Sequence, residues 1–457
     1  MKDDCSRTAH QTTITFRSLR WLRWLASARI IIVCTLLGLP LSLSACSPFP
    51  EIQSGSLFPS PVTYVTAGPL PQATATATLP PIVKPTDIPA TLAPKKLPLE
   101  STSAIGLWSD QITSTQTFTG VVDIAMGSAA VQMEQTDLAL VSLTRREVYY
   151  GYGSDITDVV ANHPSWVLHD KNGKVVYAKT GDQEPLLDIR NDDVKNQLAD
   201  DVSKLIQAGP YDGIILDGVG DELIRSTSPP VVTGTTLFKD PQRQSAVEGL
   251  LRTIRAKIPN KVLIIGGYAW SDGEAYAAHT SEAQSLADLV DGVHIDEFLR
   301  APISGTNKYK SEADWKRDVD YLSAISKDNK IVLITTRLYD SNAPTNTVRA
   351  WFMYSVASYL LGKNGTRTYF QFDAQGNLSY AMDPLLSAPI GAPQDAYTKL
   401  SSGIYQRLFA NGIVLVNPTT KTKDTQLQGK YHILGTNEAV DKITLLPHTG
   451  EILLKVS

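Results

Sequence analysis

A six-residue phrase occurs twice in this chain and constrains its fold more than any other feature. The copies are Asp212–Asp217 (DGIILD) and Asp291–Asp296 (DGVHID). Each is a short run of β-forming residues that begins at Asp-Gly and ends at an acid, which is typical of a buried parallel strand. Asp217 and Asp296 therefore stand at the C-terminal tips of two strands. In an eight-fold β/α barrel, active sites are built at those tips.

Strands and helices alternate along the body of the chain, which indicates βαβ units and a parallel sheet. Eight units predict a (β/α)8 TIM barrel over residues 101–390. The structural alternative is an open doubly wound sheet, but no glycine-rich nucleotide-binding loop follows the first strand. The stretch 117–133 stays unassigned. The expected strands are 104–108, 137–143, 166–169, 214–217, 262–266, 293–296, 331–335 and 368–372, and the expected helices are 191–208, 245–258 (with a capping box at Ser245 and Glu248), 281–289, 311–326 and 345–361.

The pattern changes after Phe372. Residues 404–418 have the pattern of a hairpin whose turn is Asn411-Gly412, a strong two-residue turn signal. Two more short strands are expected at 442–445 and 452–456. Residues 391–457 therefore form, by this interpretation, a small C-terminal β-domain packed on the end of the barrel.

The N-terminal segment has the features of an export signal. Several arginines precede the apolar run 30–43, and Leu43-Ser44-Ala45 then precedes Cys46. This arrangement resembles the bacterial lipobox, and the resemblance implies a lipoprotein signal peptide at 1–45, cleavage before Cys46 and lipidation of Cys46. An uncleaved membrane anchor is the alternative. Residues 46–100 are rich in Pro, Thr and Ala and are expected to form a disordered linker. We expect a protein lipid-anchored to the cell membrane, on its extracytoplasmic face.

Composition excludes several other classes of function. The three cysteines are Cys5, Cys34 and Cys46, so the folded part carries no disulfide and no thiolate chemistry. The scattered histidines predict no metal site and argue against a metal-dependent deacetylase. The formal net charge of -4 makes nucleic acid an unexpected partner. No cofactor is expected, and the sequence gives no indication of oligomeric state.

The acid pair suits glycoside hydrolysis. Alternate strands of a barrel contribute to the same layer of side chains, so Asp217 on strand four and Asp296 on strand six should face each other. Carboxyl groups about 5 Å apart act as nucleophile and acid/base, and groups roughly 6.5 to 9.5 Å apart act around a water molecule. Strand parity favours Asp296 over Glu297 as the second acid, but Glu297 stays a candidate because the strand ends there. The alternative is that such acids only cap helices or bind backbone amides.

Other side chains at predicted strand exits are candidates for binding a sugar. The aromatic candidates offer flat apolar faces, and the polar ones are suited to hydrogen bonds with hydroxyl groups; Arg337 is also suited to holding a carboxylate in place. These candidate substrate-binding residues are Trp108, Asp170, Tyr268, Trp270, Arg337, Gln371 and Asp373.

Three phrases resemble a known family: YDGIILD ending at Asp217, VDGVHIDEF containing Asp296, and YQRLFANGIVLVNP at 405–418. They resemble bacterial glycoside hydrolases of a hypothetical glycosyl-hydrolase-like family and are more distantly similar to endo-α-1,4-polygalactosaminidases. The resemblance runs from Ala104 to the C-terminus. It implies a barrel that hydrolyses glycosidic bonds without a metal, with Asp217 and an acid at Asp296 or Glu297. A glutamate is expected at the second position, where this chain has Asp296 followed by Glu297.

The sequence thus predicts an extracellular, lipid-anchored glycoside hydrolase that acts on a polysaccharide or oligosaccharide. Asp217 is the expected nucleophile or base, and Asp296 or Glu297 the expected proton donor. The alternative function is a glycan-binding surface lipoprotein that keeps the barrel scaffold without catalysis.

Overall fold

The computed structural model describes residues 105–456 apart from 113–119, 135–139, 148–155, 171, 178–184, 210, 218, 220–240, 267–285, 301–303, 328, 376–377, 435 and 437. The chain divides into Met1–Ile82 and Val83–Ser457, and every described residue belongs to the second unit. The expected signal peptide, Cys46 and the linker lie outside the described residues. No described helix is long and apolar enough to cross a membrane.

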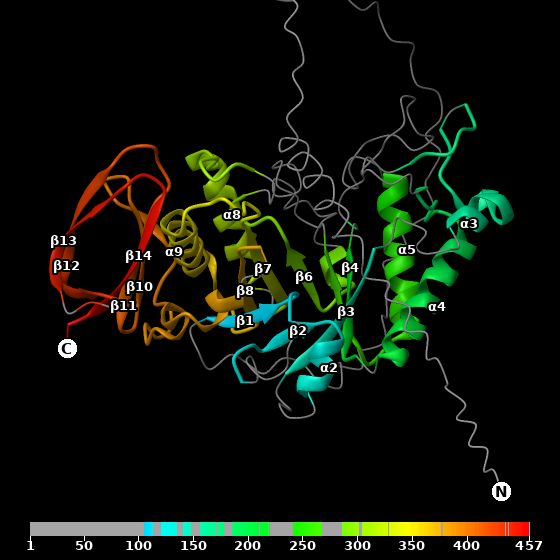
Figure 1. Cartoon of the computed structure of the whole chain (residues 1–457), viewed down its shortest axis with the longest axis horizontal. Helices are drawn as coiled ribbons and strands as arrows, with labels where there is room; N and C mark the ends of the chain where they lie inside the picture. The colour runs from blue at the N-terminus through cyan, green and yellow to red at the C-terminus, as the bar shows by residue number, and fades with distance from the viewer. Residues whose placement is uncertain are drawn as a thin grey trace, which may run out of the picture. The chain divides into compact units, whose positions relative to one another are not determined.

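Eight parallel strands close into a barrel, which confirms the predicted fold (Figure 1). Each strand is hydrogen-bonded to the next, and β8 returns to β1. The strands are β1 (Gly106–Ser109), β2 (Ile124–Met126), β3 (Val141–Glu147), β4 (Gly213–Asp217), β5 (Val262–Ile265), β6 (Gly292–Ile295), β7 (Ile331–Arg337) and β8 (Thr368–Asp373).

The two copies of the repeated phrase are the fourth and sixth barrel strands, as predicted. The numbering agrees because one expected strand is absent from the barrel and one unexpected strand replaces it. The expected third strand, 166–169, lies between β3 and α4 in the chain and is not part of the barrel. Val167 and His169 form isolated antiparallel bridges, with Leu187 and Val175. The true β2 lies in the stretch left unassigned, and the expected second strand is β3. A strand of three residues such as β2 is too short to show a period.

The Asp-Gly that opens the repeated phrase has a structural role. Asp212 Oδ2 accepts the backbone N–H of Ser142 at 3.1 Å, and Asp291 Oδ2 accepts that of Leu263 at 2.9 Å, so each acid bonds to the preceding strand. The glycine allows close approach to the following strand, because a Cβ on Gly213 would lie 2.3 Å from the carbonyl oxygen of Val262. A Cβ on Gly292 would lie 2.2 Å from that of Ile331.

Helices cover the outside of the barrel. α4, α8 and α9 lie within one residue of their predicted bounds, whereas α2 and α3 were not predicted. Asn191 caps α4 and Ser311 caps α8, each by accepting a backbone N–H in the first turn. The predicted capping box at Ser245 is wrong, because α5 begins at Pro241. Most of the expected helix 281–289 lies outside the described residues. The helices are α2 (Ser128–Glu134), α3 (Ile156–Asn162), α4 (Asp192–Ala208), α5 (Pro241–Lys257), α8 (Glu312–Ile325) and α9 (Thr345–Gly362).

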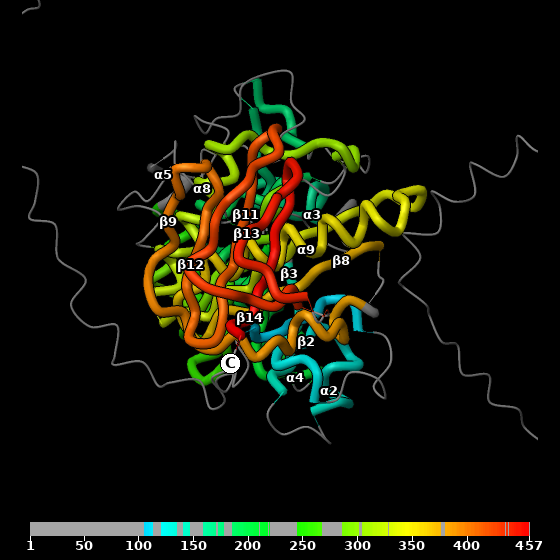
Figure 2. The backbone as a smooth tube through the Cα atoms, turned by 90° about the vertical axis from the view of Figure 1, so that its left-hand side faces the viewer, coloured from blue at the N-terminus to red at the C-terminus, as the bar shows by residue number. Residues whose placement is uncertain are grey.

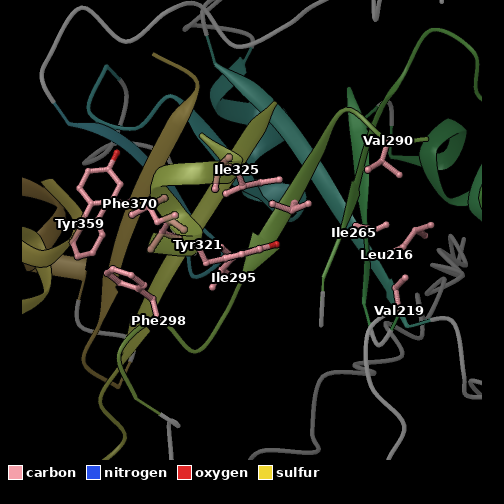
Figure 3. Close-up of a cluster of buried hydrophobic side chains, with 14 of the residues drawn as sticks. Leu216, Val219, Ile265, Val290, Ile295, Phe298, Tyr321, Ile325, Tyr359 and Phe370 are labelled. Atoms are coloured by element: carbon pink, nitrogen blue, oxygen red, sulfur yellow. The ribbon is translucent and has the colours of Figure 1, made fainter. Parts of the chain in front are cut away.

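The barrel strands separate two apolar clusters by parity. Inward residues form one cluster, which includes Trp108, Ile215 and Tyr369. Outward residues such as Leu216, Ile265 and Ile295 join the helices in the other (Figure 3). Because Ile215 is in the inner cluster, the parity of β4 directs Asp217 inward as well.

The C-terminal region is a six-stranded antiparallel sheet, in the order β13-β12-β14-β11-β10-β9. Figure 2 views the protein from the side on which this sheet lies. The predicted hairpin is present as β10 and β11, but its two-residue turn is Ala410-Asn411 and not Asn411-Gly412, because Phe409 pairs with Gly412. The longest strand, β12, was not predicted, because polar residues dominate its sequence KDTQLQGKYHI. The strands are β9 (Thr398–Lys399), β10 (Tyr405–Phe409), β11 (Gly412–Asn417), β12 (Lys423–Ile433), β13 (Ala439–Leu445) and β14 (Thr449–Lys455).

This sheet packs on the flank of the barrel, against α9, and not on the end that the sequence suggested (Figure 1). The packing against α9 is close: a Cβ on Gly450 would lie 2.5 Å from that of Ala357. Arg407 of β10 donates to the carbonyl oxygens of Leu360 at 3.1 Å and Leu361 at 2.9 Å, which belong to the last turn of α9. The orphan carbonyls of that helix end are thus satisfied from the C-terminal sheet.

Candidate functional site

Asp217 and Asp296 stand at the same height in the barrel. Leu216 of β4 pairs with Ile265 of β5, and Ile265 pairs with Val293 of β6. In an eight-stranded barrel of this kind the pairing partner on each following strand lies about one residue lower, because the strands are staggered. The β6 residue level with Asp217 is therefore Asp296, two positions beyond the hydrogen-bonded register.

Asp373 belongs to the same layer. Ile295 pairs with Ile334 of β7, and Ile334 pairs with Phe370 of β8. The same stagger places Asp373 level with Asp296. Three alternate strands, β4, β6 and β8, thus each contribute one aspartate to one ring at the C-terminal mouth of the barrel.

Arg337, at the end of β7, links the β6 and β8 acids and a further aspartate from the exit of β1. Its Nε donates to Asp296 Oδ1 at 2.6 Å, its Nη1 to Asp373 Oδ2 at 2.8 Å and its Nη2 to Asp110 Oδ2 at 2.5 Å. The side chains of Arg337, Asp110 and Asp373 are 4%, 3% and 1% exposed, whereas that of Asp296 is 34% exposed. Asp296 is therefore the acid of this group that a ligand can reach.

The opposite charges in this cluster favour the ionised forms of Asp110 and Arg337. Burial works to raise the pKa of Asp110, but the guanidinium of Arg337 and its hydrogen bonds outweigh burial and lower it. Burial works to lower the pKa of Arg337, but Asp296 and Asp110 outweigh it and raise that pKa. Tyr339 donates to Asp373 Oδ2 at 2.9 Å, and burial raises the pKa of its hydroxyl, so the phenol stays a donor.

Asp217 has its own arginine. Arg145 of β3 forms an ion pair with Asp217 Oδ2, and the Asp217 side chain is 10% exposed. On its other side is Gly266, at the end of β5, where a Cβ would lie 2.1 Å from Asp217 Oδ1. The carboxylate thus occupies space that any other residue at position 266 would fill.

His294 lies below this ring and is uncharged at neutral pH. Its Nε2 is 3.4 Å from Thr335 Oγ1 and 3.6 Å from Asp296 Oδ1, and its ring meets that of Trp108 edge-on at 4.8 Å. Burial lowers the pKa of His294 to about 4, although the carboxylate of Asp296 opposes that shift. A neutral imidazole here is part of the packed floor of the mouth.

The predicted sugar-binding residues other than Asp170 separate into three groups. Arg337 was a candidate for binding a hydroxyl group or for holding a carboxylate, and in the structure it holds the carboxylate of Asp296. Trp108, Gln371 and Asp373 do lie inward near strand ends, but all are buried, so none offers a surface for stacking or hydroxyl contact in this structure. Tyr268 and Trp270 lie outside the described residues.

Asp170 is not at a barrel strand exit, because the strand expected before it does not belong to the barrel. Its Oδ1 accepts the backbone N–H groups of Asn172 and Lys174 at 2.8 and 2.9 Å, so the carboxylate supports its own turn. Glu297 is half-buried and lies in the turn after β6, beside Asp296.

Sequence reasoning missed three polar residues of the site: Asp110, Arg145 and Tyr339. The missed signal is parity: Asp110 stands two residues beyond Trp108 and Arg145 two beyond Leu143, both inward-facing. Arg145 lies past the predicted end of its strand, and Tyr339 lies past the end of β7. Among the described residues, no group of three or more His, Cys, Asp or Glu side chains is arranged to hold a metal ion.

The chain is similar to several solved structures at low identity. It is 9% identical to trehalose-6-phosphate hydrolase of Bacillus licheniformis (TM-score 0.46, covering 77% of this chain and 99% of that one). It is 12% identical to an alpha-amylase from Lactobacillus plantarum (TM-score 0.44, 77% and 99%). It is 11% identical to the glycoside hydrolase domain of PelA from Pseudomonas aeruginosa (TM-score 0.39, 60% and 95%). TM-scores this low carry no argument by themselves.

One curated protein is similar over a shorter stretch. It is the 5-dehydro-2-deoxygluconokinase of Clostridium beijerinckii, 29% identical over 140 residues, which are 30% of this chain. The chain spans 39% of the length of that relative. The match is too short and too distant to assign a family.

A family model gives the assignment. The model for hypothetical glycosyl hydrolase family 15 matches residues 145–413, which run from β3 through β11 and include Asp217, Asp296 and Arg337. The match covers more than half of the 457 residues. The chain therefore belongs to hypothetical glycosyl hydrolase family 15.

Proposed function

We propose that this protein hydrolyses glycosidic bonds of a polysaccharide or oligosaccharide and that Asp217 and an acid at the exit of β6 perform the reaction. The observation that carries the proposal is the pair of inward aspartates at one height on β4 and β6 of a closed barrel. Both are held by arginines, Asp217 by Arg145 and Asp296 by Arg337. Family membership supports a glycan as the substrate class.

The charge of the mouth suits this reaction. Four aspartates, at 110, 217, 296 and 373, share two arginines, at 145 and 337. The transition state of glycoside hydrolysis resembles an oxocarbenium ion and carries positive charge on the sugar ring. A mouth with an excess of carboxylates stabilises that charge as it develops.

The arginine contacts also bear on the roles of the acids. An arginine that donates to a carboxylate favours its ionised form, which suits Asp217 as the nucleophile or base. Arg337 also holds Asp296, and the proton donor at the exit of β6 is Asp296 or its neighbour Glu297. In this mechanism the donor protonates the leaving oxygen, while Asp217 attacks the anomeric carbon or removes a proton from water.

We expect aryl glycosides with different leaving groups to separate these roles. Asp217→Asn should lose hydrolysis of every substrate. Loss of the proton donor should lower turnover by about 10²- to 10⁴-fold for an alkyl leaving group and far less for dinitrophenolate, which leaves without protonation. The measurement is kcat for Asp217→Asn, Asp296→Asn and Glu297→Gln after the wild-type substrate has been found in a glycan panel.

Asp291→Asn is the matched control, because it alters an acid at the opposite end of the same strand as Asp296. It should leave the dependence on leaving group unchanged. Glycan binding without turnover, retained in both Asp217→Asn and Asp296→Asn, would instead support a non-catalytic glycan-binding lipoprotein.

We also propose that the protein is lipid-anchored through Cys46 on the extracytoplasmic face of the cell membrane. The support is the apolar run followed by Leu-Ser-Ala-Cys at 43–46. Cys46→Ala should move the protein from the membrane fraction to the soluble fraction or arrest it as an unprocessed precursor, and labelled fatty acid should no longer be incorporated. Unchanged labelling in Cys46→Ala would refute lipidation at this residue; Cys34→Ala is the control.

A further inference from the structure

Asp110 is, with Asp373, one of the two acids of the Arg337 cluster that are buried away from a ligand. It follows β1 by one residue, and its side chain is 3% exposed. Both of its carboxylate oxygens are occupied: Oδ2 accepts from Arg337 Nη2 at 2.5 Å and Oδ1 from Gln371 Nε2 at 2.7 Å. It therefore acts through its neighbours and not on a substrate.

The guanidinium of Arg337 connects Asp110 to Asp296 by hydrogen bonds. A guanidinium is a rigid planar fork, so fixing one edge fixes the direction of the other N–H groups. Nη2 is held by Asp110, and Nε, which lies in the same plane beside Nη2, donates to Asp296 Oδ1 at 2.6 Å. Among the side chains of Asp110, Arg337, Asp296 and Asp373, that of Asp296 is the most exposed, so its position depends most on the contact with Arg337.

We infer that Asp110 is a positioning residue for the β6 carboxylate: it orients Arg337, and Arg337 orients Asp296. The chain of hydrogen bonds runs from Gln371 of β8 to Asp110 of β1, then to Arg337 of β7 and Asp296 at the β6 exit. The catalytic part of this inference rests on the proposed function. The positional part does not, because it concerns groups within the protein.

The test compares Asp110→Asn with wild type by two independent measurements. The first is kcat and KM for the glycan that the wild type hydrolyses: kcat should fall by about 10²-fold, the cost of a misplacement of about 1 Å, with KM changed far less. The second is the titration of the Asp296 carboxyl carbon by ¹³C NMR, with its signal assigned by its absence in Asp296→Asn. In Asp110→Asn the loss of a nearby negative charge by itself lowers the Asp296 midpoint, so the decisive titration is that of Gln371→Met, which keeps this charge. There the Asp296 midpoint should rise, because Arg337 is no longer held in its direction toward Asp296.

Gln371→Met provides a second variant that keeps the charge of Asp110 and removes only the amide that holds it. It should lower kcat in the same direction by a smaller factor. Asp291→Asn is the control, because Asp291 pairs with Arg255 at 2.7 Å at the start of β6, away from the mouth. It should change neither kcat nor the Asp296 titration.

A purely structural role of Asp110 predicts another result. Thermal stability would then fall in Asp110→Asn and Gln371→Met while kcat of both folded variants and the Asp296 midpoint of Gln371→Met stayed as in wild type, and that result would overturn the inference. If no glycan is turned over by the wild type, the proposed function fails, and the NMR titration alone still decides whether Asp110 positions Asp296.

Discussion

Arg337→Met is expected to destabilise the protein by about 3–5 kcal/mol. It removes the cation that three carboxylates share, and the side chains of Asp110 and Asp373 are 3% and 1% exposed. Removing one partner of a buried ion pair costs about 3–5 kcal/mol, because a charge is left buried without compensation. The share of Asp296 in that cost is small, since its side chain is 34% exposed and solvent screens it. The free energy of unfolding from chemical denaturation measures the effect.

The destabilisation of Arg337→Met should depend on pH. In wild type, Arg337 lowers the pKa of Asp110, so this acid stabilises the fold above its unfolded pKa and loses that contribution as pH falls. Without Arg337, burial, the largest effect on Asp110, outweighs the remaining hydrogen bond from Gln371 and raises its pKa. The stability of the variant should then be greatest at acidic pH and should fall as pH rises through the folded pKa. The difference in unfolding free energy between variant and wild type is therefore expected to be larger at pH 7 than at pH 4.

Arg317→Met is the control, because Arg317 forms an exposed ion pair with Asp314 on α8. Exposed pairs contribute roughly 0–1 kcal/mol, so this variant should unfold close to wild type. An Arg337→Met variant that unfolds like Arg317→Met, with no change between pH 4 and pH 7, would show that Asp110 and Asp373 are not held as a charged cluster.

The sequence was sufficient for the barrel because the strands that matter most have strong patterns. In β4 and β6, Asp-Gly begins the strand and an acid ends it. The opening Asp accepts a backbone N–H of the preceding strand, and the Gly allows the following strand to approach closely. In β5 and β7, continuous apolar runs fill both faces of a buried strand. The short β2 and the polar β12 have neither signal, so local patterns could not find them.

The site was less predictable, because its contacts join residues far apart in the chain. Asp217, Asp296 and Arg337 were named from strand ends alone, but Asp110 meets Arg337 across 227 positions. Only the closed barrel brings β1 beside β8 and within reach of β7. The burial of Gln371 and Asp373 has the same origin: a strand-exit position predicts an inward side chain, but the neighbouring strands decide whether that side chain reaches solvent.

The Arg-Leu-Phe-Ala-Asn-Gly phrase, the most specific part of the sequence resemblance, is explained by the packing of the C-terminal sheet. Arg407 is buried and donates to Asp395 O at 2.7 Å and to Asn364 Oδ1 at 2.8 Å, as well as to the last carbonyls of α9. It also donates to Lys363 O, the C-cap of that helix. Positive charge at a helix C-terminus interacts favourably with the helix dipole, which compensates Arg407 for the loss of water.

Arg407→Met should therefore uncouple the C-terminal sheet from the barrel. The variant keeps most of the side-chain volume but leaves buried carbonyls at the end of α9 without a donor, at a cost of about 1–3 kcal/mol for each unsatisfied group. We expect a loss of roughly 3 kcal/mol or more in unfolding free energy. Hydrogen exchange should rise in the last turn of α9 and in β10, while the barrel strands around Asp217 stay protected.

Arg349→Met is the matched control, because Arg349 lies on α9, the helix whose end Arg407 contacts. Its side chain is 45% exposed, and among the described residues its ion pair is with Asp383. Its loss should cost less than about 1 kcal/mol. If Arg407→Met unfolds like Arg349→Met and exchange at the end of α9 is unchanged, the apolar contacts of the interface, such as Trp315 against Tyr405 at 4.7 Å, hold the sheet without it. If exchange rises in β10 and α9 together, the arginine couples the two parts, and the phrase marks the joint between sheet and barrel, not a second site for glycans.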